Sequence, residues 1–104
     1  MIGRTPTAEE KRWMNDITQI GCIVCRLYLK IYTPAEVHHI DGKTKAEAHK
    51  KTLPLCHPHH RLGKDTKQFT SRHPWRVRFI ERYGTEAELL ECTKMLVEAM
   101  RACM

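Results

Sequence analysis

The sequence predicts a small α+β fold in which a β-hairpin is surrounded by helices and stapled by zinc. Three observations predict it. The chain has 104 residues, too few for a core that is stable without a metal ion, a disulfide or a partner. Two pairs of metal-ligating side chains stand at close spacing, and apolar residues change from a helical period to short extended runs. No internal repeat, linker or low-complexity tract is visible, so we expect residues 1–104 to form a single domain.

Helix signals flank the predicted hairpin on both sides. Residues 7–10 are Thr-Ala-Glu-Glu, a capping box, and the apolar residues that follow at helical spacing predict a helix over residues 8–20. The same pattern at residues 85–88, Thr-Glu-Ala-Glu, predicts the start of a last helix. A further helix is expected over residues 75–83, so that the C-terminal helices together cover residues 75–102.

The centre of the chain carries the signals of a β-hairpin followed by a short helix. Residues 36–40 contain β-branched residues and end at an Asp-Gly turn signal, which predicts a strand. Residues 43–51 are polar and rich in lysine, so we expect a loop there before extended structure resumes at residues 52–55. A proline in the next segment suits the first turn of a helix that ends at Gly63.

Cysteine spacing predicts a structural zinc site. Cys22 and Cys25 form a C-x-x-C pair, and Cys56 and His59 form a second pair with the same spacing, so all four can converge on one tetrahedral ion. Other histidines stand close to the second pair and compete for the place of the fourth ligand. No apolar signal stretch precedes the first pair, which favours reduced zinc ligands over disulfides. Residues 26–32 fit either a strand or a helix, and extended structure is favoured.

Positive charge concentrates around the histidine-rich centre of the chain. Lysine and arginine number 18 against 12 aspartates and glutamates, which gives a net charge of +6. We expect the phosphate backbone of a nucleic acid as the partner of this surface, although basic residues also serve simply to solvate loops and helices. The basic residues are Lys43, Lys45, Lys50, Lys51, Arg61, Lys64, Lys67, Arg72, Arg76 and Arg78. The residues among them that we expect to contact this backbone are Lys50, Lys51, Arg61, Lys64, Arg76 and Arg78.

All seven histidines lie within residues 38–73, beside the zinc ligands rather than scattered over the helices. Hydrolysis of a phosphodiester bond needs a base that deprotonates water, a cation that stabilises negative charge, and a rigid frame. Histidine can act as the base and can bind the cation. No glutamate stands in an H-E-x-x-H or H-x-E arrangement, which disfavours a zinc hydrolase of small molecules. His57 is expected to face solvent.

Residues 37–42 and 53–60 resemble the signature of the HNH, or His-Me finger, endonucleases. The resemblance implies that residues 22–63 form a ββα-metal core around the structural zinc. It also implies DNA cleavage with a divalent catalytic metal, which would be Mg²⁺ or Mn²⁺, with Zn²⁺ as the alternative.

The HNH resemblance further implies roles for four histidines. By position, His38 matches a metal ligand, His39 matches the general base that activates water, and His60 matches the second metal ligand. His59 matches the zinc-binding position just before it. Because adjacent residues on a helix point about 100° apart, His59 can face the structural zinc while His60 faces the catalytic metal.

A longer stretch, residues 20–92, resembles the bacteriophage Ref family of recombination-enhancement proteins. The shared segments are His38-His39-Ile40, Ala48-His49, Leu53-Pro54-Leu55-Cys56, His59-His60 and Arg82-Tyr83-Gly84-Thr85-Glu86. The resemblance implies a RecA-dependent DNA endonuclease in phage recombination, with a RecA-like recombinase filament as partner. His49 and His73 also match the Ref pattern, which implies a second, histidine-rich metal site shared with His38 or His60.

One departure from the HNH signature concerns its middle asparagine, which should fall near Lys51, where no asparagine stands. In HNH enzymes that residue orients the base, so either another residue supports His39 or the base is held less firmly. The departure keeps an alternative open, a zinc-stabilised DNA-binding module or adaptor that does not cut. No apolar run is long enough to span a bilayer, so we expect a soluble protein of the bacterial or phage-infected cytoplasm without a membrane partner.

Overall fold

The structure, a computed structural model, describes residues 5–42 and 47–103. Within them it has the predicted α+β architecture, a two-stranded sheet with four α-helices and a π-helical turn. Lys43 and Lys45, with part of the predicted loop, lie outside the described residues. The elements are α1 (Ala8–Ile20), η1 (Cys25–Leu29), β1 (Glu36–His39), β2 (Thr52–Leu55), α2 (His57–His60), α3 (Arg76–Tyr83) and α4 (Glu86–Ala102).

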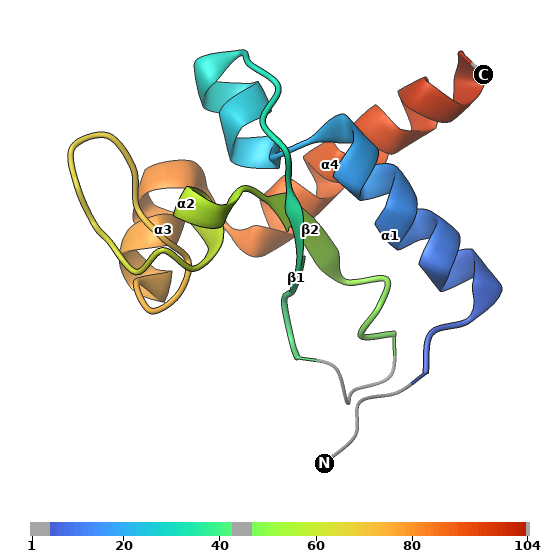
Figure 1. Ribbon diagram of the computed structural model, residues 1–104, viewed down its shortest axis with the longest axis horizontal. Helices are drawn as coiled ribbons and strands as arrows, with labels where there is room; N and C mark the ends of the chain where they lie inside the picture. Colours follow the sequence, from blue (N-terminus) through green and yellow to red (C-terminus); the bar gives the residue numbers. More distant parts are fainter. Residues whose placement is uncertain (1–4, 43–46, 104) are drawn as a thin grey trace.

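The sheet lies at the centre of the fold, between α1 on one side and α2 with α3 on the other (Figure 1). Helix α4 contacts both β2 and α1, and α2 contacts both strands. A cluster of buried Ile17, Ile20 and Val97 joins α1 to α4. Among the described residues, no helix has the length and apolar character that crossing a bilayer requires.

The starts of the two long helices follow their local sequence signals. At α1, Thr7 Oγ1 accepts a hydrogen bond from the Glu10 backbone N–H at 3.1 Å, and Glu10 Oε1 accepts one from the Thr7 N–H at 2.8 Å. The same reciprocal pair forms between Thr85 and Glu88 at α4. Both predicted capping boxes are confirmed. Helix α1 ends at Ile20 and is capped by Gly21, where a positive φ and a nearby carbonyl oxygen leave no room for a Cβ.

Two segments differ from the sequence prediction. Within residues 26–32, where extended structure was favoured, η1 continues a helical turn that begins directly after Cys22. The Arg26 N–H donates to the Cys22 carbonyl at 3.0 Å and closes this turn. Cys22 and Cys25 are both buried in it, so the burial of the two thiols outweighs the strand preference of the apolar–polar alternation. The second difference is α2, which ends at His60 rather than at Gly63.

The register of the hairpin sorts two adjacent histidines onto opposite faces. The strands pair antiparallel, with His38 opposite Leu53 and His39 opposite Thr52. Because successive side chains of a strand alternate, His38 and His39 leave β1 on opposite sides. Val37 shares the face of His39 and packs against the cluster between α1 and α4, so this face is turned toward α1.

The main apolar core encloses the cysteines of the predicted zinc site. Cys22, Cys25 and Cys56 are buried together with residues of β2, α3 and α4, among them Phe79 and Tyr83. Buried thiolates need a counter-charge, because transfer of an isolated charge from water into an apolar core is costly. The position of the cysteines within the core therefore favours a metal ion there.

Candidate functional site

Four side chains converge where η1 meets α2. One ligand atom from each of Cys22, Cys25, Cys56 and His59 lies within 4.8 Å of the other three. Cys25 Sγ is 3.8 Å from Cys56 Sγ and 3.6 Å from His59 Nδ1. A tetrahedral zinc ion with ordinary bond lengths gives edges of about 3.8 Å between two sulfurs and about 3.6 Å between sulfur and nitrogen. This Cys₃His group, as predicted, could hold a structural zinc.

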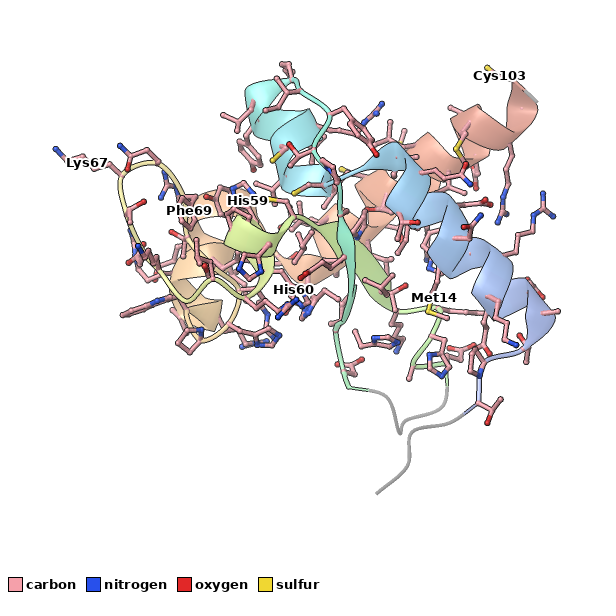
Figure 2. The ribbon with its side chains drawn as sticks, in the orientation of Figure 1. Met14, His59, His60, Lys67, Phe69 and Cys103 are labelled. Atoms are coloured by element: carbon pink, nitrogen blue, oxygen red, sulfur yellow. The ribbon has the colours of Figure 1, made fainter. Side chains whose placement is uncertain are left out.

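Local structure and packing fix the ligands of the Cys₃His group. Cys56 is the N-cap of α2, and Pro58 occupies the first turn of that helix. The rings of Phe69 and Tyr83 pack edge-on against the His59 ring, and Figure 2 shows Phe69 beside His59. The imidazole therefore has little freedom to turn away from the three thiols.

The acid–base chemistry of the thiols also favours a cation. The pKa of Cys22 is raised to about 12, first by its hydrogen bond with Cys56 and then by burial. Burial also raises the pKa of Cys25, whereas the hydrogen bond from Cys22 lowers the pKa of Cys56. The protein alone thus supports one thiolate better than three, and a dication would supply the missing positive charge.

Three histidines form a second group that could hold a metal ion, here called the histidine group: His38, His60 and His73. One ring nitrogen of each lies within 4.8 Å of the other two, and the ring centroids are 5.1 to 5.4 Å apart. His38 is 1% exposed whereas His73 is exposed, so the group is open to solvent on one side. The His73 N–H donates to the His60 carbonyl at 2.9 Å, which ties the loop before α3 to α2.

Two carboxylates hold rings of the histidine group. Glu86, in the first turn of α4, lies 2.7 Å from His38 Nε2 through its Oε2 atom, and both side chains are buried. Glu36, on β1, lies 2.8 Å from His60 Nδ1 through Oε1. Histidines that bind metals commonly donate their second N–H to a carboxylate, which fixes the tautomer and the ring orientation. Both contacts have this form.

Arginines keep the two carboxylates ionised. Arg61 donates to both oxygens of Glu36, at 2.9 and 2.7 Å, and this contact lowers the pKa of Glu36 to about 2. Burial opposes ionisation of Glu86, but the hydrogen bond with His38 and the charge of Arg72, at 3.1 Å, outweigh it and lower the pKa of Glu86. Each carboxylate can therefore accept a hydrogen bond from its histidine.

Burial favours the neutral forms of two members of the histidine group, His60 and His73. Burial lowers the pKa of His60, against the opposing effect of its hydrogen bond to Glu36. Burial also lowers the pKa of His73, to which the nearby His38 adds. A metal ion binds the neutral form of imidazole, so both shifts favour ligation.

Two predicted site residues lie outside the histidine group. His39 Nε2 is 3.1 Å from His49 Nδ1, and the two rings meet edge-on. His49 is buried in the turn before β2. The structure thus brings His73, but not His49, to His38 and His60, and it makes His49 the neighbour of the predicted base.

Sequence reasoning missed both carboxylates of the histidine group. For Glu36 a signal existed, because it precedes His38 by two residues on one strand, and residues at this spacing share a face. Glu86 ends one of the segments shared with the Ref family, but nothing in the local sequence indicated its contact with His38, because 48 positions separate the two residues. Only the packing of α4 against the sheet brings these two together.

The basic side chains expected to contact DNA are all exposed. Arg61 pairs with Glu36 at 2.7 Å, and Arg76 Nε lies 3.8 Å from Glu86, so both reach the surface beside the histidine group. The remaining ones are Lys50, Lys51, Lys64 and Arg78. His57 is exposed as predicted, 4.0 Å from Glu36.

A sequence model of the family described as recombination enhancement, RecA-dependent nuclease, matches residues 6–98. The chain belongs to this family. The matched region contains the Cys₃His group, the histidine group and both of its carboxylates, so the geometry above lies within the part of the chain shared with RecA-dependent nucleases. The resemblance noted over residues 20–92 is confirmed and covers a longer stretch.

Loss of one thiol from the Cys₃His group should unfold the protein. We expect Cys56→Ser to lose one zinc ion per chain and its cooperative thermal transition, because zinc binding supplies folding free energy in so small a core. Metal analysis and circular dichroism melting measure both effects. Cys92→Ser, on α4 and outside the ligand group, is the matched control and should keep its zinc and melt normally. A Cys56→Ser protein that melts like the wild type would contradict the assignment.

Proposed function

We propose that this protein is a metal-dependent DNA endonuclease of the HNH type, which hydrolyses phosphodiester bonds. The observation that carries the proposal is the histidine group, in which carboxylates orient two of the three rings. The family description, a RecA-dependent nuclease, agrees with it. In this proposal the Cys₃His group is structural and the histidine group is catalytic.

The donor set of the histidine group indicates which metal fits best. With Nε2 of His38 on Glu86 and Nδ1 of His60 on Glu36, the opposite ring nitrogen of each histidine is available as a ligand. Imidazole nitrogens suit Zn²⁺ and other transition metals better than Mg²⁺, which prefers oxygen. We therefore rank Zn²⁺ above Mn²⁺ and Mg²⁺. A bound divalent ion would supply Lewis-acid stabilisation of the charge that develops on the phosphate.

The proposed base is His39, supported by His49. His39 Nε2 lies 3.1 Å from His49 Nδ1, and this contact would hold the His39 ring in position to take a proton from the attacking water. His49 would then orient the base, which is the role of the middle asparagine in HNH enzymes. Since β1 directs His38 and His39 to opposite faces, the scissile phosphate would have to lie at the end of the strand to reach both.

The proposed substrate is DNA, and the proposed partner is a RecA-like recombinase filament, as the family description suggests. Arg61 and Arg76 are exposed beside the carboxylates of the histidine group, where they can meet a phosphate backbone. A role in phage recombination within a bacterial cytoplasm belongs to the same proposal.

One observation favours a second candidate function, a zinc-stabilised DNA-binding module or adaptor without cleavage activity. His39 contacts His49 rather than the histidine group, so the predicted base is not preassembled with the predicted metal ligands. A protein that only binds DNA would not need His39 and the histidine group to reach the same phosphate. The two functions differ in whether the loaded protein cuts DNA.

Replacing the proposed base should separate these functions. We expect His39→Ala to lower the rate of DNA cleavage by roughly 10² to 10⁴-fold, the usual contribution of general-base catalysis, while zinc content, folding and DNA binding stay near normal. A plasmid-nicking assay with Zn²⁺, Mn²⁺ or Mg²⁺, with and without a RecA-like filament, measures the rate.

His60→Ala serves as the comparison. It should also abolish cleavage, but through lost metal, so a higher metal concentration should partly restore it and exogenous imidazole should not. His39→Ala should show the reverse pattern. Wild-type cleavage by His39→Ala would remove that histidine from the mechanism. A loaded wild type that cuts under none of these conditions would favour the binding module.

Replacement of Lys50 and Lys51, which precede β2, should lower the affinity for DNA and make that affinity less dependent on salt. The exposed Lys50 and Lys51 form long ion pairs of 3.9 and 4.0 Å, which contribute little to stability. We expect the double alanine variant to lower the slope of log affinity against log salt by roughly 2, about 1 for each lost phosphate contact. Lys11→Ala with Arg12→Ala, also exposed, removes the same charge from α1 as a control. Equal slopes for both double variants would exclude Lys50 and Lys51 from the interface.

A further inference from the structure

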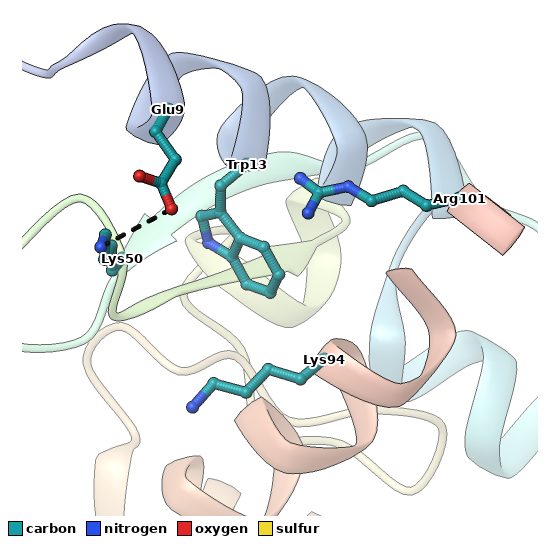
Figure 3. A pocket seen from close by; sticks show the side chains of 5 residues that line it. All are labelled: Glu9, Trp13, Lys50, Lys94 and Arg101. Carbon is teal, nitrogen blue, oxygen red and sulfur yellow. Dashed lines mark ion pairs between the residues drawn. The ribbon is translucent and has the colours of Figure 1, made fainter. Parts of the chain in front are cut away.

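A hollow with an aromatic wall lies between α1, α4 and the turn before β2. Its lining residues are Glu9, Trp13, Lys50, Lys94 and Arg101. Figure 3 shows the Trp13 ring between Lys50 and Arg101, with Lys94 on the neighbouring helix. None of these side chains belongs to the Cys₃His group or to the histidine group.

The Trp13 ring is held as a fixed wall of this hollow. Its Nε1–H donates to Thr52 Oγ1 at 2.9 Å, and the ring packs at the edge of the cluster that joins α1 to α4. The ring is still partly exposed. A ring anchored by its polar edge can offer an aromatic surface to a ligand at little cost in side-chain entropy.

The charge of the hollow is positive. Lys50 comes from the turn before β2, and Lys94 and Arg101 both come from α4, whereas the lining has one carboxylate, Glu9. Glu9 lies 3.9 Å from Lys50 in an exposed pair, which a phosphate can displace at little cost. Arg101 is held by Asp16, outside the lining, at 2.8 and 2.7 Å. An aromatic face among cations is the arrangement that binds unpaired nucleotides, with stacking for the base and charge for the phosphate.

We propose that this hollow binds one nucleotide of single-stranded DNA, its base stacked on Trp13 and its phosphate held by Lys50 and Lys94. The proposal rests on the proposed function, because it takes DNA as the substrate. A base within a duplex has both faces covered by its neighbours and cannot stack on a side chain unless it is unpaired or flipped out. The substrate class that fits the hollow is therefore a strand that is already unpaired.

The hollow is connected to the proposed base. Thr52, which accepts the hydrogen bond from Trp13, itself donates from Oγ1 to the His49 carbonyl at 3.3 Å. His49 contacts His39, and Lys50 follows His49 directly in the chain. A nucleotide stacked on Trp13 would thus lie near the end of β1 that carries His39.

Fluorescence of Trp13 tests the proposal without any cleavage. The chain has two tryptophans, so Trp75→Phe leaves Trp13 as the sole tryptophan, whose emission can be excited selectively. We expect oligo(dT) to quench this emission, because stacking brings a base into contact with the indole ring, and we expect a blunt duplex of equal length to quench it far less. Fluorescence anisotropy of labelled oligo(dT) reports binding separately.

A second variant, made in the Trp75→Phe protein, tests the hollow through one of its cations and leaves Trp13 in place. Lys94→Ala should lower the slope of log affinity against log salt by about 1 and weaken the quenching at a given oligo(dT) concentration. The exposed ion pair of Lys94 with Glu91, at 3.4 Å, adds little to stability, so this variant should fold. Lys11→Ala is the matched control, because Lys11 stands two residues from Trp13 and hence about 200° around α1.

Bound oligo(dT) without a change in Trp13 emission would overturn the proposal. So would equal quenching by the duplex, or equal effects of Lys94→Ala and Lys11→Ala. A protein that cuts DNA while Trp13 emission stays constant would refute nucleotide binding in this hollow and leave the endonuclease proposal standing. A protein whose Trp13 is quenched but which never cuts would support the hollow and refute the endonuclease.

Discussion

Helix α2 has four residues, yet it supplies a ligand to each of the two groups. His59 and His60 are adjacent, and neighbouring residues leave a helix about 100° apart, so the position of one ring determines the direction of the other. A zinc ion on His59 would lock α2 against β2 and η1 through the three cysteines. The geometry of the histidine group therefore depends on the Cys₃His group, although the two share no ligand.

The histidine group and the carboxylate that holds His38 come from four separate segments. His38 comes from β1, His60 from α2, His73 from the loop before α3, and Glu86 from the first turn of α4. A carboxylate in the first turn of a helix is stabilised by the helix dipole, which helps to offset the burial of Glu86. Because these segments are fixed by the core, the rings need little rearrangement to meet a metal ion. Such preorganisation is what a hydrolytic site requires.

Much of the fold could be predicted because its signals are local. Capping boxes, glycine stops and paired ligand spacing lie within a few residues of one another and gave the long helices, the hairpin and the Cys₃His group. Interactions across the fold could not be predicted in this way. The contact of Glu86 with His38 depends on how α4 docks, and the pairing of His49 with His39 depends on the path of the turn before β2. The helical turn at η1 could not be predicted because apolar and polar residues alternate over residues 26–32, a pattern typical of a strand.

Native mass spectrometry of the zinc-loaded protein, compared with His73→Ala, tests the central claim most directly. His73 is exposed, so its loss should not disturb the core. The account predicts two zinc ions in the wild type, one in His73→Ala, and nearly equal melting temperatures, because only the catalytic metal is lost. A wild type that binds one ion, or a variant that loses both ions and unfolds, would contradict the division of the molecule into a structural and a catalytic metal group.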